Sequence, residues 1–136
     1  KCTHYFDNWI KHFSPEDNLT FIQNVIKRSE QEFEYLWENL ENYQNDPQID
    51  NIVIVTHTLP DIKYCDNHSE LDNSSVQYNT QFQKLLQYSK ISRWVFGHTH
   101  QEWNDSINHI ETICNPRGRP NDYDRILYQV KTILID

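Results

Sequence analysis

Residues 51–57 read NIVIVTH, an unbroken run of β-branched apolar residues that leads into the polar pair Thr56-His57. Short β-branched runs that are apolar on both faces are typical of buried strands. Residues 91–96 read ISRWVF, a second short stretch that we interpret as a strand, and it leads into Gly97-His98-Thr99-His100. The two runs predict two buried strands, each followed at its carboxyl end by histidine.

Helical patterns surround these two runs. Ser14-Pro15-Glu16-Asp17 combines an N-cap serine, a proline at the first helical position and acidic residues in the first turn, so it predicts a helix start. Apolar residues then recur at spacings of three and four, which predicts a core-facing stripe, and the helix should fade near Tyr43. The stripe comprises Leu19, Ile22, Ile26, Phe33, Leu36 and Leu40.

The remaining chain alternates loops with shorter periodic segments. Residues 58–75 read as a polar loop, and residues 76–88 as a second helix. Residues 107–114 and 126–135 read as strands on either side of a turn at 115–118. The order of elements predicts an α/β fold, and the absence of repeats or a linker favours a single unit over residues 1–136.

Composition restricts the classes of partner. The 136 residues carry a net charge of −8, which argues against a nucleic-acid-binding surface but does not exclude a phosphate ester beside bound cations. No apolar run approaches the roughly 20 residues that a membrane span needs, so we expect a soluble chain. Cys2, Cys65 and Cys114 are odd in number and widely spaced, which favours reduced thiols and a cytoplasmic location.

The histidines are the candidate functional residues. In α/β sheets, ligands bind at the carboxyl ends of the strands, where His57, His98 and His100 are expected. Neutral imidazole is a common ligand of zinc, iron and manganese, so the three rings could form part of a metal site. Two alternatives stay open: hydrogen-bonded surface histidines, and a zinc site that draws on Cys65 and His68.

Three motifs together resemble those of a known family. Residues 55–60 are similar to the strand-His-x-x-Pro motif of the calcineurin-like metallophosphoesterases. Residues 97–100 match the Gly-His-x-His motif of that family. Residues 114–118 resemble the Asn-Pro-Arg-Gly turn of its bacterial-type single-domain branch. The order and spacing of the motifs extend the resemblance over essentially the whole chain.

The resemblance implies a fold, a site and a reaction. The fold would be the C-terminal half of a four-layer α-β-β-α metallophosphatase sandwich with mixed sheets. His57 and His98 would bind one divalent ion (Mn, Fe or Zn) and His100 a second, and a metal-activated water would hydrolyse a phosphate ester. Arg117 would contact the substrate phosphate or brace its turn. The ester itself, whether phosphoprotein, nucleotide or phosphodiester, is left open.

The chain departs from the family pattern in its first half. The family's remaining ligands come from an Asp-x-His, a Gly-Asp-x-x-Asp and a Gly-Asn-His-Asp/Glu, and none of these motifs lies ahead of His57. Glycine occurs only at Gly97 and Gly118, so the glycine-containing motifs have no place upstream. We therefore expect this chain to supply the histidine half of a dinuclear site, to need a missing N-terminal half as partner, and to be inactive alone. The alternative is a truncated, non-catalytic remnant with a binding or structural role.

Overall fold

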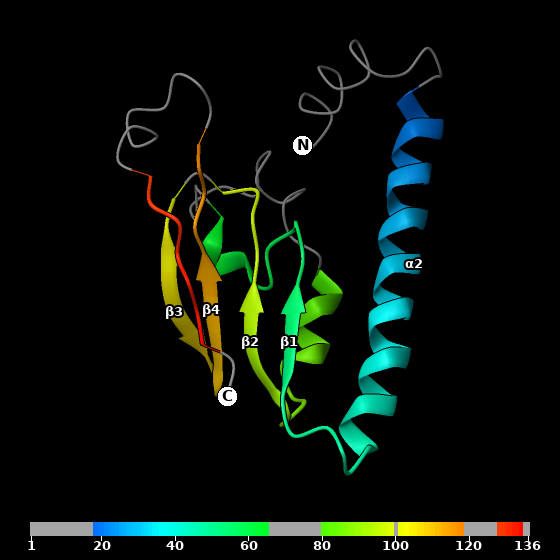
Figure 1. Ribbon diagram of the computed structural model, residues 1–136. Helices are drawn as coiled ribbons and strands as arrows, with labels where there is room; N and C mark the ends of the chain where they lie inside the picture. Colours follow the sequence, from blue (N-terminus) through cyan, green and yellow to red (C-terminus); the bar gives the residue numbers. More distant parts are fainter. Residues whose placement is uncertain (1–17, 66–79, 100, 119–127, 135–136) are drawn as a thin grey trace.

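The computed structural model describes residues 18–65, 80–99, 101–118 and 128–134 (Figure 1). Within these ranges one long α-helix and one four-stranded mixed sheet form a mixed α/β fold, which confirms the predicted class. In chain order the elements are α2 (Asn18–Asn45), β1 (Ile52–Val55), η1 (Ile62–Tyr64), η3 (Thr80–Leu85), β2 (Ile91–Val95), β3 (Trp103–Ile107) and β4 (Ile110–Cys114), where η marks a 3-10 helix.

The strand order in the sheet is β1-β2-β4-β3. Strands β1, β2 and β4 are mutually parallel, while β3 runs antiparallel to β4 at the edge. The carboxyl ends of the three parallel strands therefore lie along one edge of the sheet, where the arrows point in Figure 1. The predicted strands at 51–56 and 91–96 are both confirmed, and they pair directly with each other.

The core lies on one face of this sheet. Ile54, Trp94 and Thr112 stand side by side on that face in the strand register, and all three are buried. Phe82 of η3 packs against Trp94 with ring centroids 5.2 Å apart. The opposite face carries the Arg93–Glu111 ion pair at 2.8 Å, so the two faces differ in polarity as expected for a partly solvated sheet.

Among its described side chains, helix α2 contacts the core through its second half. Phe33 and Leu40 are buried, and Leu36 and Trp37 pack against the same cluster. The prediction that the whole stripe faces a core is wrong at Ile26, which is 52% exposed. The side chains of Leu19 and Ile22, and the predicted helix start at 14–17, lie outside what the structure describes.

The carboxyl end of α2 is tied to the loop that precedes β2. The helix ends at Asn45, which confirms the predicted stop. Gln44 donates from Nε2 to Ser89 Oγ at 2.8 Å and accepts from the Lys90 amide at 3.1 Å. Lys90 Nζ in turn donates to the Asp46 carbonyl at 2.6 Å. These bonds fix one end of the helix, whereas the side chains of residues 23–28 are exposed.

Three sequence predictions need correction. The single strand predicted at 107–114 is a hairpin of β3 and β4, whose turn places Asn108 at a positive φ of 55°. The predicted helix at 76–88 is the short 3-10 helix η3 followed by a turn, with residues 76–79 outside the described ranges. Residues 128–134, inside the predicted strand at 126–135, have no strand pairing.

Within the described ranges, no helix is both long and apolar enough to cross a membrane. Helix α2 has the length, but charged and amide side chains interrupt its apolar positions throughout.

Candidate functional site

The parallel strands bring their carboxyl-end loops to one place. His57 follows β1 by two residues, His98 follows β2 by three, and Asn115 follows β4 directly. Because β2 lies between β1 and β4, the loop with His98 is central. The edge at which the sequence predicted ligand binding is therefore the edge that carries these side chains.

A chain of hydrogen bonds through Thr56 holds the loop after β1. The Thr56 amide continues the parallel ladder by donating to the Val95 carbonyl at 3.0 Å. Its hydroxyl donates to the Thr58 carbonyl at 2.7 Å and accepts from Trp94 Nε1 at 2.9 Å. The loop then enters the core at Leu59 and Pro60, which are both buried. His57 is thus fixed between the ladder on one side and the core on the other.

The 3-10 helix η1 braces the same loop from beyond Pro60. Asp61 caps it by accepting from the Lys63 amide at 2.9 Å, so this carboxylate has a structural contact and is half-buried. Lys63 Nζ then reaches β3, donating to Asp105 at 2.8 Å and to the Ser106 carbonyl at 2.8 Å. The pKa of Asp105 is lowered by this hydrogen bond from Lys63.

A buried tyrosine completes the brace. The Tyr64 hydroxyl shares a hydrogen bond with Thr112 Oγ1 on β4, and its ring packs 4.8 Å from that of Phe96. Burial raises the pKa of Tyr64, so the phenol stays neutral across the physiological range. These contacts are structural, and they position the loop that carries His57.

Gly97 lies where the loops of His57 and His98 meet. The Gly97 amide donates to the His57 carbonyl at 3.3 Å. The amide of the preceding residue, Phe96, donates to the Ile113 carbonyl at 2.9 Å. A Cβ at position 97 would stand 3.4 Å from His57 Nδ1 and 3.7 Å from the His57 carbonyl oxygen. These distances are ordinary van der Waals contacts, so a small side chain would fit at position 97, whereas a branched one would meet the His57 ring.

His98 sits in a sharp turn with unusual backbone geometry. Its φ is +67°, a region that non-glycine residues rarely adopt, and the Thr99 amide donates to the Gly97 carbonyl at 2.9 Å. A hydrogen bond across one residue of positive φ marks a γ-turn, which is strained. Thr99 is buried, and its hydroxyl accepts from the Gln101 amide at 3.2 Å, which anchors the turn. Such strain is typical of functional sites.

The two histidine rings meet directly. His98 Nδ1 lies 3.0 Å from His57 Nε2, with ring centroids 5.0 Å apart and planes at 77°. With neutral imidazoles, one ring can donate its N–H to the other. If both nitrogens are instead unprotonated, each has a lone pair that could bind a cation beside the pair. His57 is exposed and His98 is half-buried, so the pair is open to solvent on one side.

The spacing of the pair fits a shared metal ion. Two imidazole nitrogens that bind one ion at about 2.1 Å, with an angle of about 90–110° between them, lie about 3.0–3.4 Å apart. The observed 3.0 Å falls at the short end of this range. Two neutral imidazole nitrogens suit zinc and iron, and they suit manganese where oxygen ligands complete the site. No third His, Cys, Asp or Glu joins them among the described residues, and His100 lies outside those residues.

The other residues singled out from the sequence are Arg117 in the loop after β4, and Cys65 and His68. Arg117 is exposed, three residues beyond β4, and Gly118 follows it with a φ of +74°. Asn115 Nδ2 donates to the Gln129 carbonyl at 3.0 Å, so the turn contacts the C-terminal segment. Cys65 is buried and His68 lies outside the described residues, so the Cys65–His68 zinc alternative stays a prediction.

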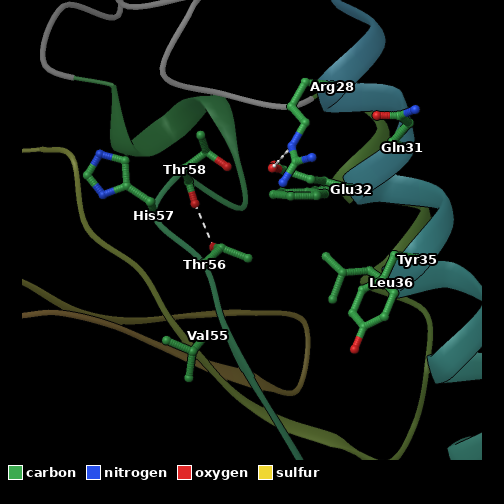
Figure 2. Close-up of a pocket in the computed structure, with 10 residues that line it drawn as sticks. Arg28, Gln31, Glu32, Tyr35, Leu36, Val55, Thr56, His57 and Thr58 are labelled. Carbon is green, nitrogen blue, oxygen red and sulfur yellow. Dashed lines mark hydrogen bonds and ion pairs between the residues drawn. The ribbon is translucent and has the colours of Figure 1, made fainter. Parts of the chain in front are cut away.

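A groove beside His57 was not predicted from the sequence. It has a volume of about 600 Å³ and lies between α2 and the end of β1 (Figure 2). Helix α2 contributes Arg28, Gln31, Glu32, Tyr35 and Leu36, and the β1 side contributes Val55, Thr56, His57 and Thr58, with Phe82 from η3. Its two walls come from residues about 20 to 30 positions apart, so it depends on the tertiary arrangement and has no local sequence signal.

Comparison with known proteins leaves the histidine pair as the main guide to function. No family model matches this chain, and neither a curated protein nor a solved structure does.

Proposed function

We propose that the chain supplies the histidine half of a dinuclear metal site that hydrolyses a phosphate ester, as in the calcineurin-like metallophosphoesterases. The observation that carries the proposal is the 3.0 Å approach of His57 Nε2 and His98 Nδ1 at the ends of adjacent parallel strands. These two histidines are 41 positions apart in the sequence, and they contact each other through ring nitrogen atoms. They lie in the two loops whose motifs resemble those of the family. On this proposal the mixed sheet and α2 form half of the four-layer sandwich.

The proposed roles of His57 and His98 follow the positions of their side chains, and that of His100 follows the family motif. His57 and His98 would hold one divalent ion, and His100 a second. When bound, such ions would stabilise the charge on the phosphoryl oxygens and lower the pKa of a bound water, which makes it a better nucleophile at neutral pH. The chain itself contributes rigidity, since the Thr56 hydrogen bonds, Gly97 and the γ-turn at His98 fix the nitrogens relative to each other. Arg117 would contact a substrate phosphate from the neighbouring loop.

The test compares the 136-residue chain with a longer protein that includes the upstream coding sequence. With manganese and an aryl phosphate, we expect turnover from the longer protein and none from the 136 residues alone. His57→Asn and His98→Asn should abolish turnover in the longer protein, whereas His109→Asn should retain it, because His109 contacts only the Tyr88 carbonyl among described groups. Turnover that survives loss of both His57 and His98 would refute the proposal. An upstream sequence without carboxylate motifs would favour the non-catalytic remnant.

A further inference from the structure

Strand β1 forms an edge of the sheet. It stands first in the strand order, so among the described residues it pairs on one side only, with β2. The amides of Ile52 and Thr56 donate to β2 carbonyls at 2.8 Å and 3.0 Å. Successive residues of a strand direct their peptide groups to opposite sides, so the peptide groups of Val53 and Val55 point away from β2. Two amides and two carbonyls are therefore directed outward from this edge.

The two edge strands differ in their protection against further pairing. Natural sheets protect their edges with charged side chains, with proline or with a covering segment. At the β3 edge, Lys63 Nζ pairs with Asp105 and also donates to the Ser106 carbonyl. Strand β1 reads IVIV, without charge or proline, and Val55 at its carboxyl end is 72% exposed. The β1 edge is therefore the one that favours the addition of a strand.

The groove lies on this outer side of β1. One wall is formed by residues 55–58, and the other by α2, which stands on the side of β1 away from β2 (Figure 1, Figure 2). A strand spacing of about 4.8 Å, a layer thickness of about 10 Å and a rise of about 3.3 Å give about 160 Å³ for each residue of an added strand. The volume of about 600 Å³ thus holds about four residues, the length of β1. The helix wall favours a single extended segment over the sheet edge of a second folded copy.

The lining of the groove suits a segment that is uncharged and partly apolar. Its formal charges lie on Arg28 and Glu32, which pair with each other at 2.9 Å between Nε and Oε1 and are well exposed. Leu36 and Phe82 supply apolar surface, and Tyr35 adds a ring that is 68% exposed. Figure 2 shows Tyr35 and Leu36 on the side of α2 that faces β1. Because a strand points alternate side chains to opposite faces, every second side chain of the segment would meet this apolar wall.

We propose that the groove binds an extended, uncharged peptide segment of a partner protein as an added strand of the sheet. Its main chain would bond to the outward peptide groups of Val53 and Val55, and its alternate apolar side chains would pack against α2. In this mode of recognition the main-chain bonds supply affinity and the contacts of alternate side chains supply specificity. The interaction involves neither His98 nor a bound metal, so it goes beyond the proposed hydrolysis of a phosphate ester.

Titration of the metal-free 136-residue chain with a synthetic peptide tests the inference. The probe carries alternating valine and threonine residues between terminal lysines, and its control has N-methyl groups on the two central amides. Consecutive amides point to opposite edges of a strand, so the control loses a donor to β1 in either orientation. We expect the probe to slow hydrogen exchange at the amides of Val53 and Val55 by about 10-fold or more, and the control to bind about 10-fold more weakly. Equal affinity for the two peptides, or unchanged exchange at these amides, would overturn the inference.

Two variants of the chain test the two walls separately. Val55→Pro removes an outward amide without breaking a bond to β2, so it should weaken the probe about 3- to 10-fold. Tyr35→Ala removes an exposed ring and should weaken it by a similar factor even if the proline variant does not fold. Tyr43→Ala, at an exposed tyrosine of the same helix outside the groove, should bind like the wild type. Wild-type affinity in Tyr35→Ala would overturn the inference, as would protection of Val53 in the free chain that rises with protein concentration, because a second copy would then occupy the edge.

Discussion

Gly97 lies against His57 so closely that a Cβ on residue 97 would stand 3.4 Å from the Nδ1 atom of the histidine ring. A methyl group at this distance is in ordinary contact, whereas a branched side chain would push the ring away. We expect Gly97→Ala to alter Zn²⁺ affinity less than about twofold and Gly97→Val to lower it about 10- to 100-fold, as displaced metal ligands commonly do. Isothermal titration with Zn²⁺ measures both. Wild-type affinity in a folded Gly97→Val variant would contradict the account.

The positive φ at His98 predicts that two substitutions which both remove the imidazole differ in the stability of the fold. His98→Gly and His98→Ala both remove the imidazole, but only glycine adopts a φ of +67° without steric cost. We expect the metal-free glycine variant to be more stable than the alanine variant by about 1 kcal/mol. Urea denaturation of the two variants provides the measurement. Equal stability would show that residue 98 bears no backbone strain.

We expect substitution of Thr56 to change the free energy of unfolding more than substitution of His98 does. Thr56→Val removes the acceptor of the buried Trp94 indole and the donor to the Thr58 carbonyl. Leaving the indole N–H unpaired should cost about 1–3 kcal/mol, while Thr56→Ser keeps both bonds and should cost less than about 1 kcal/mol. Thermal unfolding distinguishes the two variants. Thr58→Val serves as control, because the observed bond uses the carbonyl of Thr58 and not its side chain.

Tyr88 makes the stability depend on pH. Burial and the hydrogen bond to Glu41 raise the pKa of Tyr88 from 10.0 to about 12. Between these values the folded state holds the phenol proton and the unfolded state has lost it, so the free energy of unfolding falls as pH rises. The contribution of Tyr88 is therefore complete below pH 10 and lost towards pH 12.

Tyr88→Phe tests this pH dependence. At pH 7 the variant should be about 1–3 kcal/mol less stable than the wild type, because a hydrogen bond to a carboxylate is lost. That difference should shrink as pH rises from 10 towards 12 in urea denaturation. Tyr43→Phe, at an exposed tyrosine, provides the control. A difference that stays constant up to pH 12 would show that the pKa of Tyr88 is not raised.

The buried strands were predictable because their signal is local. A β-branched run such as residues 52–55 has few alternatives to a strand, and residues 91–95 combine Ile91 and Val95 with the aromatic Trp94, which also favours a strand. The hairpin at 107–114 was missed because its turn, Asn108-His109, lacks glycine and was read as part of a continuous strand. Ile26 was misplaced because helical periodicity shows which face is apolar, and not how far the sheet beneath it extends.

Part of the candidate site was likewise predictable from the sequence, and part depends on the tertiary structure. That His57 and His98 follow strands could be read from the sequence, but their 3.0 Å contact depends on β1 and β2 being neighbours in the sheet. The positive φ of His98 could not be predicted from the sequence, since non-glycine residues adopt it in only a few per cent of cases even though histidine is enriched among them. Tyr35 was one of several polar-face residues on α2, and only the position of the helix beside β1 places it in the groove.

The central claim is that His57 Nε2 and His98 Nδ1 hold one metal ion. Histidine ¹⁵N NMR during titration with Zn²⁺ tests it atom by atom, because each ring nitrogen has its own resonance. We predict that these two nitrogens shift together and saturate at the same Zn²⁺ concentration, that His109 does not respond, and that His57→Asn abolishes the shift at His98. Independent responses of the two rings, or no response at either, would contradict the account.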